Sequence, residues 1–188
     1  MIMKTIAKTY IAAATLLLML ATFSVPAQAQ EACVFGSFDN SRINYPGGDL
    51  NGAEHDTLRG IIESTGAVIG TGSPSLTVGY LGGVDVFYTS LLDQGNGALT
   101  GQEQTVLQDW IAAGGTLIVT ADIFPLPAYE SFTSFYGVTG YSSVAGSVPG
   151  TPQTLHAITV GVNGYTFVTP VSFTTGPDAL ILGNNGAG

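Results

Sequence analysis

The chain has 188 residues and a formal net charge of −9, with 45% hydrophobic residues and only 9% charged ones. Both lysines lie within the first eight residues, so the remaining chain has two arginines and thirteen acidic side chains, a formal charge of −11. This balance argues against nucleic acid and anionic lipid surfaces as partners, because binding them depends on clustered Lys and Arg. The absence of lysine after residue 8 also excludes a Schiff-base lysine and a phosphate-loop lysine in the rest of the chain.

Residues 1–29 have the pattern of a bacterial-type secretory signal peptide. A positively charged start is followed by an apolar stretch over 11–23 and a small-residue cleavage site ending at Ala29. The apolar stretch is shorter than the roughly 20 residues that a membrane-spanning helix needs. We therefore expect cleavage after Ala29, no later membrane span, and a secreted, periplasmic or cell-surface protein in which residues 30–188 form one domain.

Cys33 is the single cysteine, so no internal disulfide can form and the fold must be held by its core. We expect Cys33 to be buried in the first strand. The alternative, a lipoprotein cysteine, is less favoured because residues 30–32 are not the small and apolar set that such a site requires.

The first half of this domain alternates predicted strands with a helix. The helix over 51–65 should begin with a cap formed by Asn51 and Glu54, and should bury Leu58, Ile61 and Ile62. Apolar runs predict the first three strands at 33–38, 67–71 and 84–89.

The clearest predicted element is the helix that follows. Thr100 and Glu103 form a capping box, and the helix should end at Gly114. One face carries Val106, Leu107, Trp110 and Ile111. The next run, TLIVT at 116–120, lacks polar alternation, which is typical of a strand covered on both faces in a parallel sheet. These elements predict a doubly wound α/β fold, mostly a parallel sheet with helices on both faces.

The rest of the chain is less regular. We expect a short helix over 127–136 and a loop over 141–152, which is rich in Gly, Ser and Pro. Two further strands are predicted at 165–173 and 179–182, forming an antiparallel edge.

The string LTGQEQTVLQDWIAAGGTLIVTAD at 99–122 resembles the helix-turn-strand signature of the class I glutamine amidotransferase-like superfamily. Residues 83–86 (GVDV) and 155–162 (LHAITVGV, with His156) resemble further segments of its exported members. The resemblance covers most of 33–182. It implies a flavodoxin-like fold that is C-terminally incomplete, because a strand pair and a closing helix would follow.

Activity in that superfamily depends on a cysteine at a tight strand-to-helix elbow. Here the corresponding turn, 120–124, reads TADIF and holds neither Cys nor Ser. The resemblance therefore implies an exported branch that lacks the catalytic cysteine. No catalytic residue is assigned.

Ligands of open α/β sheets usually sit beyond the carboxyl ends of the strands, which places Asp39, Asn40, Arg42 and Asp122 near a candidate site. Arg42 would pair with a ligand carboxylate there. The alternative, which we favour, is that Asp39 and Asn40 cap a turn while Arg42 neutralises an acid. His156 is either a base or a packing residue.

Other site chemistries lack their motifs. A calcium site is conceivable from four aspartates, but no EF-hand spacing is present. The aspartates are Asp39, Asp49, Asp56 and Asp122. The sequence has no zinc motif, no G-x-S-x-G serine elbow and no dinucleotide fingerprint, so we expect no metal and no cofactor. His55 should be solvated.

These observations predict an exported, acidic, non-catalytic domain that binds or scaffolds a glycan or an envelope protein. One alternative is a hydrolase or sugar-processing enzyme using Asp39, Asp122 and His156. Another is a structural part of a longer surface-anchored protein.

Overall fold

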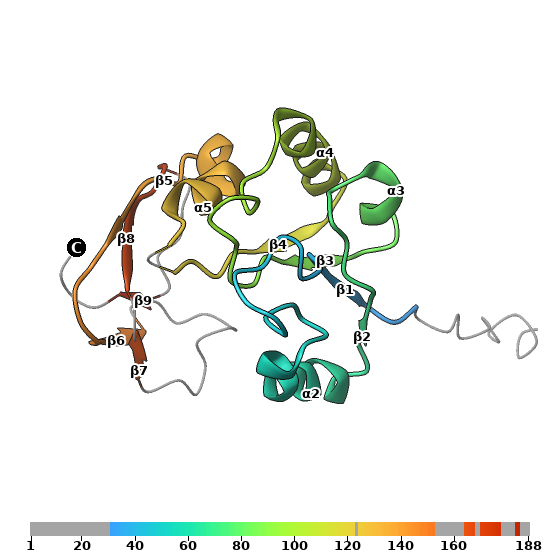
Figure 1. The fold of residues 1–188 in the computed structure, drawn as a ribbon, viewed down its shortest axis with the longest axis horizontal. Coiled ribbons are helices and arrows are strands. Elements are labelled where there is room, and N and C mark those ends of the chain that lie inside the picture. Colours follow the sequence, from blue (N-terminus) through green and yellow to red (C-terminus); the bar gives the residue numbers. More distant parts are fainter. Residues whose placement is uncertain (1–30, 123, 153–163, 168–169, 178–182, 185–188) are drawn as a thin grey trace, which may run out of the picture. The chain divides into compact units, whose positions relative to one another are not determined.

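The computed structural model describes residues 31–122, 124–152, 164–167, 170–177 and 183–184. The chain divides between Glu31 and Ala32, and the unit described here is the second one (Figure 1). The predicted signal peptide, His156 and the predicted strand at 179–182 lie outside the described residues.

Four parallel strands form the first sheet, in the order β2-β1-β3-β4. In this order the second strand returns to one side of the first and the later strands to the other, which is the flavodoxin-like arrangement. The predicted fold class is confirmed. The strands are β1 (Val34–Ser37), β2 (Val68–Ile69), β3 (Val86–Tyr88) and β4 (Thr116–Ile118).

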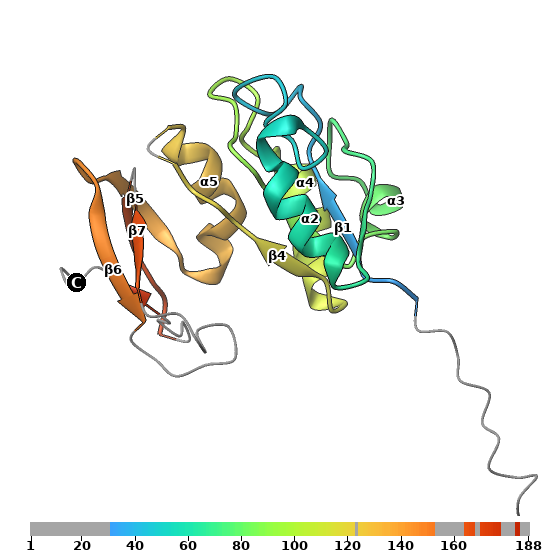
Figure 2. The same cartoon turned by 90° about the horizontal axis from the view of Figure 1, so that it is seen from below.

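Helices lie on both faces of this sheet: α2 on one, α3 and α4 on the other (Figures 1 and 2). The predicted capping box of α4 is confirmed, because the Thr100 side chain accepts from the Glu103 N–H while the Glu103 carboxylate accepts from the Thr100 N–H. The helical elements are η1 (Ala53–His55), α2 (Asp56–Ser64), α3 (Val78–Leu81) and α4 (Gly101–Ala112).

The main hydrophobic core lies on the α3 and α4 side of the sheet. Phe87 from β3 meets Phe38 edge to face at 5.1 Å between ring centroids, and Phe38 meets Phe132 at 6.0 Å. Leu107 of α4 is fully buried in the same cluster. Such aromatic pairs add about 0.5–1.5 kcal/mol to the area that they bury.

The α2 side is more open, and three predictions for it are wrong. Ile62 is buried, but Ile61 is 60% exposed. Asn51 does not cap the helix, because its side-chain amide instead donates to the carbonyl of Gly70. Ile118 on β4 is 39% exposed, so the last parallel strand is not covered on both faces. This strand is at the edge of the four-stranded sheet, with β3 as its neighbour there.

The C-terminal part begins with the predicted short helix, observed as α5 (Leu126–Thr133) and η2 (Ser134–Tyr136). Two antiparallel sheets follow, β5-β8 and β7-β6-β9. The predicted strand at 165–173 is observed as two strands, β7 and β8, which pair antiparallel but in two separate sheets. Their bounds are β5 (Thr139–Ser143), β6 (Val148–Pro152), β7 (Tyr165–Phe167), β8 (Val171–Thr174) and β9 (Gly183–Asn184).

The predicted loop over 141–152 is wrong, because most of this segment belongs to β5 and β6. Gly146 takes a left-handed conformation (φ +81°) between the two strands. The strands pair with residues 165–184, so the partners that stabilise them are distant in sequence. Tertiary pairing overrides the weak strand propensity of Gly and Pro here.

Cys33 is exposed and precedes β1, so the expectation of a buried strand cysteine is wrong. Within the described ranges, no helix has the length and apolar character needed to cross a membrane.

Candidate functional site

The carboxyl ends of β1 and β3 meet at the point where a flavodoxin-like sheet usually binds its ligand. In this chain the loops that follow the two strands pair with each other across that point. Ile43 forms an antiparallel bridge with Leu92, and the Asn44 N–H donates to the Leu91 carbonyl at 3.0 Å. The protein's own backbone therefore joins the two loops at the usual position of the ligand crevice.

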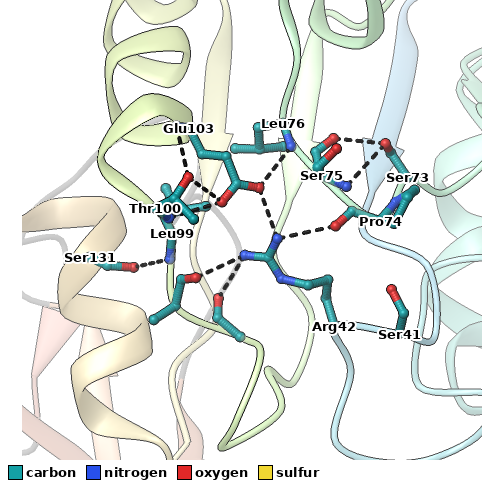
Figure 3. Close-up of polar contacts among 12 residues, drawn as sticks. Ser41, Arg42, Ser73, Pro74, Ser75, Leu76, Leu99, Thr100, Glu103 and Ser131 are labelled. Carbon is teal, nitrogen blue, oxygen red and sulfur yellow. Dashed lines mark hydrogen bonds and ion pairs between the residues drawn. The ribbon is translucent and has the colours of Figure 1, made fainter.

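The Arg42 side chain is buried beside this closure (Figure 3). Its Nη1 donates to Glu103 Oε1 at 2.8 Å and to the Pro74 carbonyl at 3.1 Å. Its Nη2 donates to the Ala98 carbonyl at 3.0 Å. The guanidinium lies 4.4 Å above the centre of the Phe38 ring, a cation–π contact. Of the two predictions for Arg42, the structure shows the second: it neutralises an acid instead of facing a ligand.

Glu103 is held at both carboxylate oxygens. Oε1 accepts from Arg42 and from the Leu76 N–H, and Oε2 accepts from the Thr100 N–H at 2.9 Å. Burial by itself would raise the pKa of Glu103, but the hydrogen bonds from Arg42, Thr100 and Leu76 outweigh it. Its pKa is therefore lower than the ordinary value of 4.5, and the group is ionised in the folded protein at neutral pH.

Asp39 and Asn40 stabilise the turn that follows β1. Asp39 Oδ1 accepts from the Ser41 N–H at 2.9 Å, and Asn40 Oδ1 accepts from the Gly47 N–H at 3.1 Å. These are the local backbone contacts that Asp and Asn make in turns. Both side chains thus stabilise a turn, as the favoured alternative predicts. Arg42 contacts Asp39 through the backbone, where its N–H donates to the Asp39 carbonyl at 3.2 Å.

Asp122 lies on the segment after β4. Burial raises the pKa of Tyr129 to about 12, with the Asp122 charge contributing to the rise and backbone hydrogen bonds from Leu92 and Asp122 opposing it. The Asp122 charge also raises the pKa of Tyr45, after burial and the charge of Glu54. The hydrogen bond from its backbone places Asp122 next to Tyr129. His156 lies outside the described residues, so the predicted convergence of Asp39, Asp122 and His156 stays a prediction.

Ser90 ties the strand ends together. It is fully buried and has φ +57°, a left-handed conformation that is unfavourable for a residue other than Gly. Its hydroxyl donates to the Gly48 carbonyl in the loop after β1, and its own carbonyl accepts from the Thr120 hydroxyl after β4. One strained residue thus links the loops after three neighbouring strands.

Four residues lie on the segments that Ser90 joins or in contact with them, and we call them the tyrosine cluster: Tyr45, His55, Tyr88 and Asp122. The Tyr45 ring lies against Gly48, Tyr88 is two residues before Ser90, and Asp122 is two residues after Thr120. The His55 and Tyr88 rings meet edge to face at 5.5 Å, with His55 Nε2 3.4 Å from the Tyr88 hydroxyl. His55 is half-buried, contrary to the expectation that it is solvated. The sequence signals only Asp122, because the other three residues come from a loop, a 3-10 helix and a strand without a shared spacing.

Two further features bear on ligands. Across the part of the chain that the structure describes, no three His, Cys, Asp or Glu side chains are grouped so that they could hold a metal ion. The four aspartates considered for calcium therefore do not form a site. A mainly apolar cavity of about 370 Å³ lies at the start of α5, where Phe124, Leu126 and Ala128 face Gln94 and Ala98 of the loop after β3.

Comparison with family models finds no match to this sequence, and comparison with curated proteins finds none either. Among solved structures, the chain is similar to one described as "mmIFT52 N-terminal domain", with a TM-score of 0.59 and 16% sequence identity. The match covers 83% of this chain and 73% of the other. At this identity the likeness shows a shared fold and carries no function.

Replacing Arg42 with Met should destabilise the protein by about 3–5 kcal/mol, because the Glu103 carboxylate then stays buried without its cation. Urea unfolding followed by circular dichroism measures this change. Arg59→Met is the control: Arg59 pairs with the exposed Asp56 and donates to the carbonyls of Leu50 and Gly52, so its loss should cost less, about 1–2 kcal/mol. Equal effects of the two substitutions would contradict the structural role of the buried pair.

The ion pair also predicts a pH dependence. Because the pKa of Glu103 is lowered on folding, its stabilisation is complete above about 4.5 and is lost as the pH falls through the folded-state pKa. Glu103→Gln should be less stable than the wild type at pH 7, and this difference should narrow steadily below pH 4.5. The free energy of unfolding of both proteins, measured between pH 3 and pH 7, tests this. A constant difference would show that the carboxylate charge is unimportant.

Ser90→Ala and Ser90→Gly separate backbone strain from the loss of the hydroxyl. Both remove the hydrogen bond to Gly48, but only Gly relieves the left-handed conformation, which costs other residues about 1–2 kcal/mol. We expect both variants to be less stable than the wild type, with Ser90→Gly about 1 kcal/mol more stable than Ser90→Ala. The urea midpoints measure this order, and the reverse order would show that the backbone is unstrained there.

Proposed function

We propose that this chain is an exported, non-catalytic binding domain of the bacterial envelope, whose partner is a glycan or an envelope protein. The observation that carries the proposal is the backbone pairing of the loops that follow β1 and β3. The loops that would have to part for a substrate are paired through Ile43 and Leu92, and Arg42 is committed to Glu103.

The resemblance to exported amidotransferase-like proteins that lack the catalytic cysteine supports the same reading. The turn after β4 offers Asp122 where that superfamily has its nucleophile, and Cys33 lies at the opposite end of β1 from the ligand edge. Export is supported by the signal-peptide pattern of residues 1–29.

Two measurements test this function together. The protein produced in a bacterial host should be recovered outside the cytoplasm, with the mass of residues 30–188. The purified protein should then sediment saturably with cell envelopes isolated from the producing organism, because binding is its proposed role. Protease treatment of the envelopes beforehand separates the partners: retained binding indicates a glycan, and lost binding indicates an envelope protein.

A chain that stays in the cytoplasm at its full mass would contradict export. Exported protein that stays in the supernatant with every envelope preparation would contradict binding. As a control for trapping, an unrelated acidic protein of similar size should not sediment.

A further inference from the structure

The tyrosine cluster lies where one face of the parallel sheet is open. Tyr88 of β3 and Ile118 of β4 are neighbours in register and so point to the same face. The His55 ring contacts Tyr88, which identifies this face as the α2 side. Ile118 is 39% exposed there, so an apolar strip of sheet continues from Tyr88 towards solvent.

Close packing, backbone strain and an unsatisfied polar atom mark the residues beside this part of the sheet. Tyr45 packs its ring against Gly48, whose carbonyl is bound by the strained Ser90. His55 carries a buried Nδ1 atom for which the described part of the chain provides no hydrogen-bond partner. Backbone strain at Ser90 and an unsatisfied ring nitrogen at His55 both cost stability, and such costs concentrate at functional sites.

The side chains of the tyrosine cluster restrict the kind of ligand that it can bind. Tyr45 and Tyr88 are half-buried and combine an apolar ring with a polar hydroxyl, which suits a ligand having both C–H faces and hydroxyl groups. Asp122 adds a carboxylate that can accept hydrogen bonds from ligand hydroxyls. The nearby charges of Glu54 and Asp122 contribute to the raised pKa of Tyr45, after its burial.

Cationic side chains are not available to balance an anionic ligand. Arg42 is bound to Glu103, and Arg59 is bound to Asp56 and to the carbonyls of Leu50 and Gly52. These are the only two Lys or Arg residues of 30–188. An acidic or phosphorylated ligand would meet carboxylates without a compensating charge.

We propose that the tyrosine cluster is a binding site for an uncharged glycan, with the rings of Tyr45 and Tyr88 packing on sugar C–H faces and Asp122 accepting hydrogen bonds from sugar hydroxyls. This inference rests on the proposed binding function and assigns it a ligand class and a place in the fold. It needs neither the crevice between β1 and β3 nor a catalytic group.

Titration calorimetry on the exported, purified protein tests the site with three named probes. Cellohexaose and hexa-N-acetylchitohexaose are uncharged, and polygalacturonate supplies pyranose rings that carry carboxylates. At least one uncharged oligosaccharide should bind, while polygalacturonate should not. Tyr45→Ala and Tyr88→Ala should each weaken binding about tenfold or more, as expected for loss of an aromatic contact.

Tyr136→Ala is the matched control, because Tyr136 is a 47% exposed tyrosine of η2 outside the cluster. It should change the affinity less than twofold. Tyr88→Phe keeps the ring, loses the hydroxyl and should retain most of the affinity. If Tyr88→Ala unfolds, as judged by circular dichroism, the loop variant Tyr45→Ala still decides the outcome.

The outcomes separate the site from the function on which it rests. Unchanged affinity in Tyr45→Ala, or an equal loss in Tyr136→Ala, overturns the site while glycan binding stands. A folded wild-type protein that binds neither uncharged oligosaccharide, or that prefers polygalacturonate, overturns the ligand class. The envelope sedimentation experiment then decides the proposed function by itself.

Discussion

The buried contact between the Arg42 guanidinium and the Glu103 carboxylate joins segments that are far apart in the sequence. Arg42 comes from the loop after β1, and its hydrogen bonds reach Pro74 beyond β2 and Ala98 beyond β3. Glu103 adds the start of α4 and the Leu76 N–H. One charged pair therefore contacts every loop at this end of the sheet up to α4.

This arrangement shows which contacts the polar residues at the strand ends make in the fold. Asp39 and Asn40 satisfy backbone donors within their own loop, and Arg42 neutralises Glu103. A buried ion pair is costly to desolvate and gives little net stability over an apolar pair, but removing one partner is strongly destabilising. On the α2 face of the same sheet, Tyr88 and Ile118 lie side by side, and Ile118 is 39% exposed.

Local signals predict local structure well in this chain. The capping box of Thr100 and Glu103 operates over three residues, and it correctly locates the start of α4. The parallel direction of the strands could also be predicted, because apolar runs alternate with helices along the chain. By contrast, the partner of Arg42 lies 61 positions away and has no motif. The four-residue α3 gives too short a pattern to detect.

The errors share a physical origin. The Gly- and Pro-rich segment of β5 and β6 reads as a loop because its stability comes from strands that follow much later. Ile61 and Ile118 read as core residues because an apolar side chain in a periodic element is usually buried, although neither has a covering layer here. The tyrosine cluster escapes sequence reasoning because Tyr45, His55 and Tyr88 meet only in the folded chain.

The pairing of both arginines also determines how copies of residues 30–188 interact with one another in solution. Arg42 is bound to Glu103 and Arg59 to Asp56, so eleven of the thirteen acidic side chains remain, with hardly any positive charge to attract a neighbouring copy. Copies of the domain repel one another at low ionic strength, and added salt screens that repulsion over about 10 Å at 0.1 M. Copies of the domain can therefore pack less densely at low ionic strength, because they repel one another, and more densely as the salt concentration rises.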